Sequence, residues 1–179
     1  PVGTAAAAGV NKEQDVNTAL QYPFDAPPAP GSVTTIQPGV LWVRMTLPMT
    51  LDHINLYVLE DDAGWWIVDT GLRGEETRAH WEHVFAEHLG GKPVIGMFCT
   101  HCHPDHIGQA GWLSERWKAP LWMTHGEYFV GRVFSQTGMD GPFWEGMDFY
   151  RRAGAAPEFF ENMRLRMSGF SGMVEPLPR

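Results

Sequence analysis

The 179-residue sequence has no apolar run that approaches the roughly 20 residues needed to cross a bilayer. Basic residues are also scarce: 13 lysines and arginines stand against 21 aspartates and glutamates, giving a formal net charge of -8 and a pI near 5.4. The composition therefore lacks the basic surface typical of proteins that bind nucleic acid or anionic membranes. We expect a small-molecule substrate, with no nucleic-acid partner and no membrane association.

Cysteine is almost absent, with Cys99 and Cys102 as the two examples. Two cysteines make no disulfide framework, which fits a reducing cytoplasm. Their C-x-x-C spacing also allows a redox pair or half of a zinc site. Because Cys99 ends an apolar run, we expect it in the core, and Cys102 should face away from the histidines on either side of it. Structural roles are therefore favoured for both.

The remaining composition is that of a folded protein, with 44% hydrophobic and 12% aromatic residues. The way residue types are distributed along the chain divides it into three regions. Residues 1–21 are expected to form a flexible tail, residues 22–125 a core domain, and residues 126–179 a helical cap rich in aromatic residues and methionine. The cap residues suit packing on the core or on a partner chain equally well.

The core region alternates between strand and helix patterns, which predicts an α+β fold. An extended, proline-rich lead-in at 23–38 comes first. Three closely spaced strands should form an antiparallel meander, since their connections are too short for crossovers. A helix and a further strand then continue the sheet by a crossover. The predicted strands are 40–47, 54–59, 65–68, 93–99 and 121–124, and the predicted helices are 75–89 and 107–117.

The most informative segment is Thr-His-Cys-His-Pro-Asp-His-Ile-Gly at residues 100–108, directly after the predicted strand 93–99. His101 and His103 are two apart, so on an extended segment both imidazoles project to one side and can bind one ion. Asp105 and His106 follow the turn at Pro104 and point toward a second ion. Gly108 is expected to free the backbone where the next helix begins. We call residues 100–106 the metal loop.

This loop, together with Ile-Val-Asp-Thr-Gly at residues 67–71 and the order of elements between them, resembles the metallo-β-lactamase superfamily, which includes glyoxalase II-like hydrolases. The resemblance implies an αββα sandwich with two metal ions, usually zinc, although iron and manganese suit the same ligands. His101 and His103 would bind the first ion, and Asp105 and His106 the second. Asp105 is also expected to act in catalysis.

Two residues outside the loop are expected to lie beside the site. Asp69 matches the family's strand-end aspartate, which braces the metal loop without binding the metal. His53, at the start of a predicted strand, is expected to lie near the metals without binding them, as Asp69 is. The family's further histidines and bridging aspartate come from the second half of its fold. His125 is the one histidine after His106, so the chain is expected to be the N-terminal half with a helical cap.

The implied function is hydrolysis of an ester, thioester, amide or phosphoester by water that two metal ions activate. The alternative is a truncated, catalytically incomplete half-domain that folds by pairing with another chain, because half a sandwich exposes a sheet face and an unpaired edge. We therefore expect a homo-oligomer or a complementing C-terminal chain.

Overall fold

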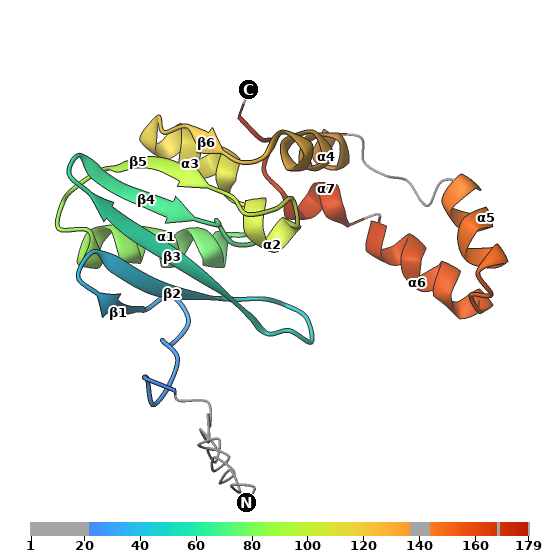
Figure 1. Cartoon of the computed structure of the whole chain (residues 1–179), viewed down its shortest axis with the longest axis horizontal. Coiled ribbons are helices and arrows are strands. Elements are labelled where there is room, and N and C mark those ends of the chain that lie inside the picture. Colours follow the sequence, from blue (N-terminus) through green and yellow to red (C-terminus); the bar gives the residue numbers. More distant parts are fainter. Residues whose placement is uncertain (1–21, 137–143, 168, 179) are drawn as a thin grey trace, which may run out of the picture.

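The computed structural model describes residues 22–136, 144–167 and 169–178, so the predicted tail at 1–21 lies outside the described residues. Its centre is one six-stranded sheet whose strands lie side by side in chain order (Figure 1). The strands are β1 (Val33–Gln37), β2 (Val40–Thr46), β3 (His53–Asp61), β4 (Gly64–Val68), β5 (Val94–Phe98) and β6 (Leu121–Trp122).

Strands β1 to β4 are antiparallel neighbours, and β4, β5 and β6 run parallel. The short turns between the first four leave no room for a crossover, whereas the β4–β5 connection contains helix α1 (Glu75–His88). The predicted meander, crossover and α+β class are thus confirmed. Strand β1 was not predicted: it lies in the proline-rich lead-in, where Val-Thr-Thr-Ile-Gln forms a strand that pairs with β2, with an irregularity between Thr35 and Gln37.

Six further helices follow β5 in the described part of the chain. The predicted single helix at 107–117 is two helices, because buried Gln109 interrupts it and donates its side-chain amide to the carbonyls of Leu72 and Gly74 (3.2 and 2.9 Å). The helices are α2 (Pro104–Ile107), α3 (Ala110–Trp117), α4 (His125–Gln136), α5 (Trp144–Arg152), α6 (Pro157–Met167) and α7 (Phe170–Met173).

Helices α1 and α3 cover one face of the sheet, and the main core lies between. Alternate residues of β3 point into it, as their pattern predicts: Ile54, Leu56 and Val58 are buried. Trp81 from α1 and Leu113 from α3 pack against them and are fully buried. Burial of each such side chain contributes about 1.5–3 kcal/mol to folding.

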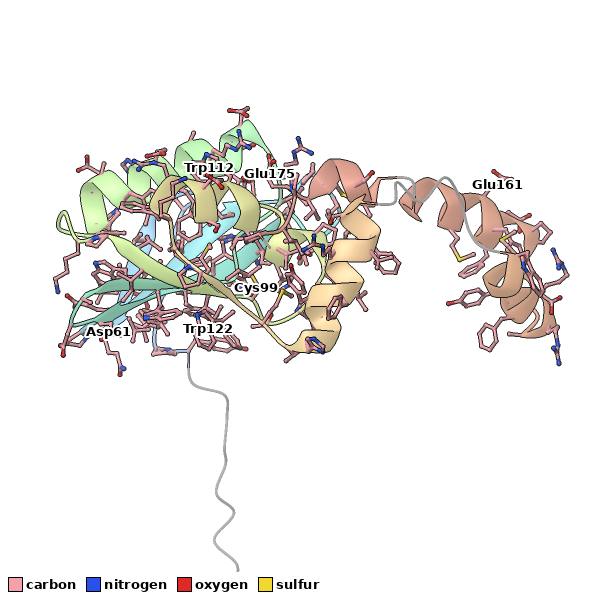
Figure 2. The ribbon with its side chains drawn as sticks, turned by 90° about the horizontal axis from the view of Figure 1, so that it is seen from above. Asp61, Cys99, Trp112, Trp122, Glu161 and Glu175 are labelled. Atoms are coloured by element: carbon pink, nitrogen blue, oxygen red, sulfur yellow. The ribbon has the colours of Figure 1, made fainter. Side chains whose placement is uncertain are left out.

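The opposite face carries large aromatic side chains that are exposed to solvent. Phe98 of β5 is 45% exposed and Trp122 of β6 is 58% exposed. Trp66 of β4 packs edge-on against Trp122, with ring centroids 6.3 Å apart. Figure 2 shows Trp122 below the sheet and Trp112 above it, on the side of α1 and α3. We call Trp66, Phe98 and Trp122 the open aromatic face.

The C-terminal helices behave in two ways. Helices α4 and α7 contact each other and lie beside a second, smaller core that contains Cys99, Ile107 and Leu177. Helices α5 and α6 project away from the sheet in both views (Figures 1 and 2). The division of the chain at residue 125 stays a prediction. No helix within the described ranges is long and apolar enough to cross a membrane.

Candidate metal site

The metal loop and Asp69 meet because β4 and β5 are parallel, which brings their carboxyl ends to the same edge of the sheet. Asp69 follows β4, and its backbone N–H donates to the carbonyl of Phe98, the last residue of β5 (2.9 Å). The backbone of Asp69 is in the left-handed region, with φ 61°. Asp and Asn tolerate this conformation better than most residues, because their short side chains bond locally.

Both carboxylate oxygens of Asp69 hold the metal loop. Oδ1 accepts a hydrogen bond from the Thr100 N–H (2.7 Å), and Oδ2 accepts one from the Thr100 hydroxyl (2.9 Å). Oδ2 also lies 2.8 Å from Nδ1 of His106. Both oxygens of Asp69 are thus engaged with the loop, and its expected role as a brace of a metal site stays a prediction.

The hydrogen bonds determine which nitrogen of His106 is available. An ionised carboxylate only accepts, so Nδ1 of His106 carries the proton and Nε2 is left free. Nε2 lies 3.5 Å from Oδ2 of Asp105. Burial alone would lower the pKa of His106, but the hydrogen bond and charge of Asp69, with the charge of Asp105, outweigh it and raise the pKa.

A second set of contacts orients His101. The Thr100 hydroxyl already donates to Asp69, so its oxygen accepts from Nδ1 of His101 (3.0 Å). This leaves Nε2 of His101 without a proton, so it can accept a hydrogen bond from Nδ1 of His103, 3.0 Å away. Burial, followed by the nearby charges of His106 and His103, lowers the pKa of His101. The neutral imidazole that results is the form that binds metal.

These two pairs of donor atoms have the spacing of metal ligands. Two tetrahedral zinc ligands with Zn–N bonds of 2.0–2.1 Å lie about 3.3 Å apart. The nitrogens of His101 and His103 are 3.0 Å apart, and His106 Nε2 is 3.5 Å from Asp105. However, no group of three or more histidine, cysteine or acidic side chains in the described part of the chain could hold an ion alone. The residues fit as two half-sets of ligands.

Two histidines outside the loop have other partners. Nδ1 of His53, at the start of β3, lies 2.6 Å from Oδ1 of Asp52. The ring of His125, at the start of α4, packs against Phe129 with centroids 4.6 Å apart. The expected role of His53 near the metals stays a prediction.

Cys99 and Cys102 are both free thiols. Burial, with the charge of Asp69 second, strongly raises the pKa of Cys99. Burial also raises the pKa of Cys102 to about 11, with Glu127 contributing a hydrogen bond and a charge. Cys99 lies in the second core, as predicted.

The expected freedom of the backbone at Gly108 is wrong. Its C-cap conformation is ordinary and right-handed, with φ -57°. The reason for glycine is the close approach of other backbone: a Cβ here would lie 2.4 Å from the Arg73 nitrogen and 2.6 Å from the Gly71 oxygen. Gly108 thus lets the end of α2 pack against the loop that follows Asp69.

The profile of the metallo-beta-lactamase superfamily matches residues 49–147, which include both strand ends and the whole metal loop. The chain belongs to this superfamily. The predicted family is thus confirmed, and the sheet with helices on one face is part of the αββα sandwich that the resemblance implied. Members of the superfamily generally bind divalent metal ions.

Solved structures agree with this assignment. A beta-lactamase domain protein from Burkholderia ambifaria is 43% identical, with a TM-score of 0.70 over 88% of this chain and 46% of its own. A metallo-beta-lactamase family protein from Thermus thermophilus is 26% identical, with a TM-score of 0.60 over 81% of this chain and 46% of its own. The chain spans less than half the length of these proteins, which fits one half of the fold.

A curated relative also matches a shorter stretch. An (R)-specific secondary-alkylsulfatase from a Pseudomonas species is 35% identical over 60 residues, which are 34% of this chain and 9% of that protein.

Proposed function

We propose that the protein is a metal-dependent hydrolase whose metal loop binds two divalent ions. Zinc suits the mixed imidazole and carboxylate donors best, and iron or manganese also fit. The observation that carries the proposal is the hydrogen-bond relay from Asp69 through Thr100 to His101. The relay leaves Nε2 of His101 free to face Nδ1 of His103, as two ligands of one ion require.

Each residue of the loop has a role in this proposal. His101 and His103 bind one ion, and Asp105 and His106 Nε2 bind the other. Asp105 is also the residue of the loop assigned to catalysis. Bound ions of this kind lower the pKa of a shared water toward neutrality and polarise the group that it attacks. Asp69 holds the loop, and His53 stays assigned to the surroundings of the site.

The proposed substrate is a small molecule with an ester, thioester, amide or phosphoester bond. Thioesters come first, because the sequence of the loop resembles that of glyoxalase II-like hydrolases. The match to an alkylsulfatase adds sulfate esters to this set. A cytoplasmic location also belongs to the proposal and is supported by the two free cysteines.

The ligand set requires residues from elsewhere, because the loop supplies two donors for each ion. The open aromatic face points to the same need, since soluble proteins seldom leave such a surface bare. We propose that a second copy of this chain or a complementing C-terminal chain covers this face. The alternative function, a half-domain without catalysis that folds by pairing, rests on the same observation.

The test is metal binding, followed by hydrolysis. We expect cobalt(II) titration of the metal-free chain to give visible absorption bands of nitrogen-ligated cobalt, and His101→Ala/His103→Ala to abolish them. The matched control, His83→Ala/His88→Ala, removes two exposed histidines from α1 and should bind as the wild type does. Binding that survives loss of His101 and His103 would overturn the proposed site.

Hydrolysis then separates the two functions. About two ions per chain, with turnover of thioester or sulfate-ester substrates that depends on the metal, is expected of the hydrolase. Metal binding without turnover, in a chain whose mass by light scattering shows a complex, would support the pairing half-domain instead.

A further inference from the structure

Glu127 lies beside the metal loop and contacts it through Cys102. It lies in the first turn of α4, two residues after His125. Its Oε2 accepts a hydrogen bond from the backbone N–H of Cys102 at 2.7 Å. Cys102 stands between His101 and His103, and its N–H belongs to the peptide group that joins it to His101, so Glu127 holds the backbone directly after His101.

This contact has a counterpart on the other side of His101. Asp69 holds the N–H of Thr100 at 2.7 Å, and Glu127 holds that of Cys102 at the same distance. His101 therefore lies between two backbone groups that are each bound to a carboxylate. Hydrogen bonds to an ionised acceptor are about twice as strong as neutral ones, so both ends of this short segment are fixed.

Helix α4 is positioned to make this contact. Gly131 lies four residues after Glu127, so the two share one face of α4. A Cβ at Gly131 would lie 3.3 Å from Cβ of Cys102 and 2.9 Å from Cδ1 of Ile107. Glycine at this position lets the helix approach the metal loop closely enough for the Glu127 side chain to reach the Cys102 N–H.

We infer that Glu127 is a positioning residue of the metal site, acting through the Cys102 backbone to hold His101 and His103 in their metal-binding arrangement. The inference rests on the proposed function, because it assumes that these histidines bind metal. Groups that orient ligands in this way typically change metal affinity about 10- to 100-fold when they are removed.

Three substitutions separate the contact from the charge. Glu127→Ala removes both. Glu127→Gln keeps an oxygen that can accept from the Cys102 N–H but loses the charge, and Glu127→Asp keeps the charge but shortens the reach. The matched control is Glu158→Ala, which removes an exposed acidic residue from the first turn of α6. Like Glu127→Ala, this substitution removes a negative charge from the first turn of a helix, but it does not change a contact with the metal loop.

The measurements are cobalt(II) affinity and, in the metal-free chain, amide hydrogen exchange at Cys102. We expect Glu127→Ala and Glu127→Asp to lose about 10-fold or more in affinity and to exchange the Cys102 amide faster. Glu127→Gln, which keeps a weaker neutral acceptor, should lose less affinity and less amide protection than Glu127→Ala, and Glu158→Ala should match the wild type. Wild-type affinity in Glu127→Ala, or equal losses in the Gln and Ala variants, would overturn the inference.

Exchange at Cys102 reports the contact without metal, so it keeps this test separate from that of the proposed function. If the His101→Ala/His103→Ala protein binds cobalt as the wild type does, the proposed function fails. If that double variant loses cobalt but Glu127→Ala does not, the inference about Glu127 alone fails.

Discussion

The hydrogen bond between Asp69 Oδ2 and His106 Nδ1, 2.8 Å long, joins the end of one parallel strand to the far end of the metal loop. Because Asp69 also holds Thr100 at the start of the loop, one carboxylate fixes both ends of the segment. The arrangement of the four proposed ligands therefore depends on the charge and the two acceptor atoms of a single side chain.

Asp69→Asn is expected to weaken the loop while keeping the shape of the side chain. The amide has one acceptor oxygen where the carboxylate has two, so it cannot satisfy Thr100 and His106 together. We expect the free energy of unfolding in urea to fall by about 1.5–3 kcal/mol and cobalt affinity to fall about 10- to 100-fold. Asp62→Asn, in an exposed turn, is the control. Unchanged stability and affinity would contradict the bracing role.

Gly108→Ala is expected to destabilise the fold through a clash with backbone atoms that cannot move aside easily. Overpacking of this kind costs about 1–3 kcal/mol. The control is Gly126→Ala in α4, where a Cβ meets nothing within 4 Å. This second change should stabilise by about 0.4–1 kcal/mol, because alanine restricts the unfolded chain. Urea unfolding measures both, and equal stabilities would refute the packing role of Gly108.

The Cys102 thiol should react slowly at neutral pH. With a pKa of about 11, the thiol stays protonated across the physiological range, and the thiolate is the reactive form. In the metal-free chain, the rate of alkylation by iodoacetamide should rise about tenfold per pH unit until the pH nears the pKa. The urea-unfolded chain, with an ordinary thiol pKa, provides the reference rate. Rapid alkylation at pH 7 would restore the redox interpretation of the C-x-x-C pair.

The open aromatic face should mediate association of the chain. Phe98→Ser/Trp122→Ser is expected to weaken self-association at least about 10-fold, because central aromatic residues dominate binding at such surfaces. The matched control is Trp144→Ser/Phe149→Ser, which removes one tryptophan and one phenylalanine from α5, exposed by 74% and 66%. Sedimentation velocity measures the association. Equal weakening by the two double variants would show that general apolarity, and not this face, is responsible.

Local patterns predicted most of the sheet. The alternation of Ile54, Leu56 and Val58 placed β3 with the correct buried face, and the apolar run that ends at Cys99 placed β5. Strand β1 was missed because prolines and glycines dominate the sequence on either side of it. The strand forms by pairing with β2, which follows it in the chain. The break between α2 and α3 was missed because the partners of Gln109 lie more than 30 positions away in the chain.

The site was predictable to the extent that its chemistry is concentrated in one segment. Four ligand-type residues within 101–106 mark a metal loop, and no tertiary information is needed to notice them. Glu127 gave no such signal. Acidic residues are common in the first turn of a helix, because their negative charge interacts favourably with the positive end of the helix dipole. Its hydrogen bond to Cys102 follows from the close packing of α4, which only the folded chain reveals.

The left-handed backbone of Asp69 also restricts which sequences can build this site. A φ of 61° is tolerated by glycine, asparagine and aspartate. Holding Thr100 and His106 together requires a carboxylate, which only aspartate and glutamate supply. The two sets share one member. Of the residues that adopt this backbone most readily, aspartate alone supplies the carboxylate, although neither demand by itself excludes every alternative.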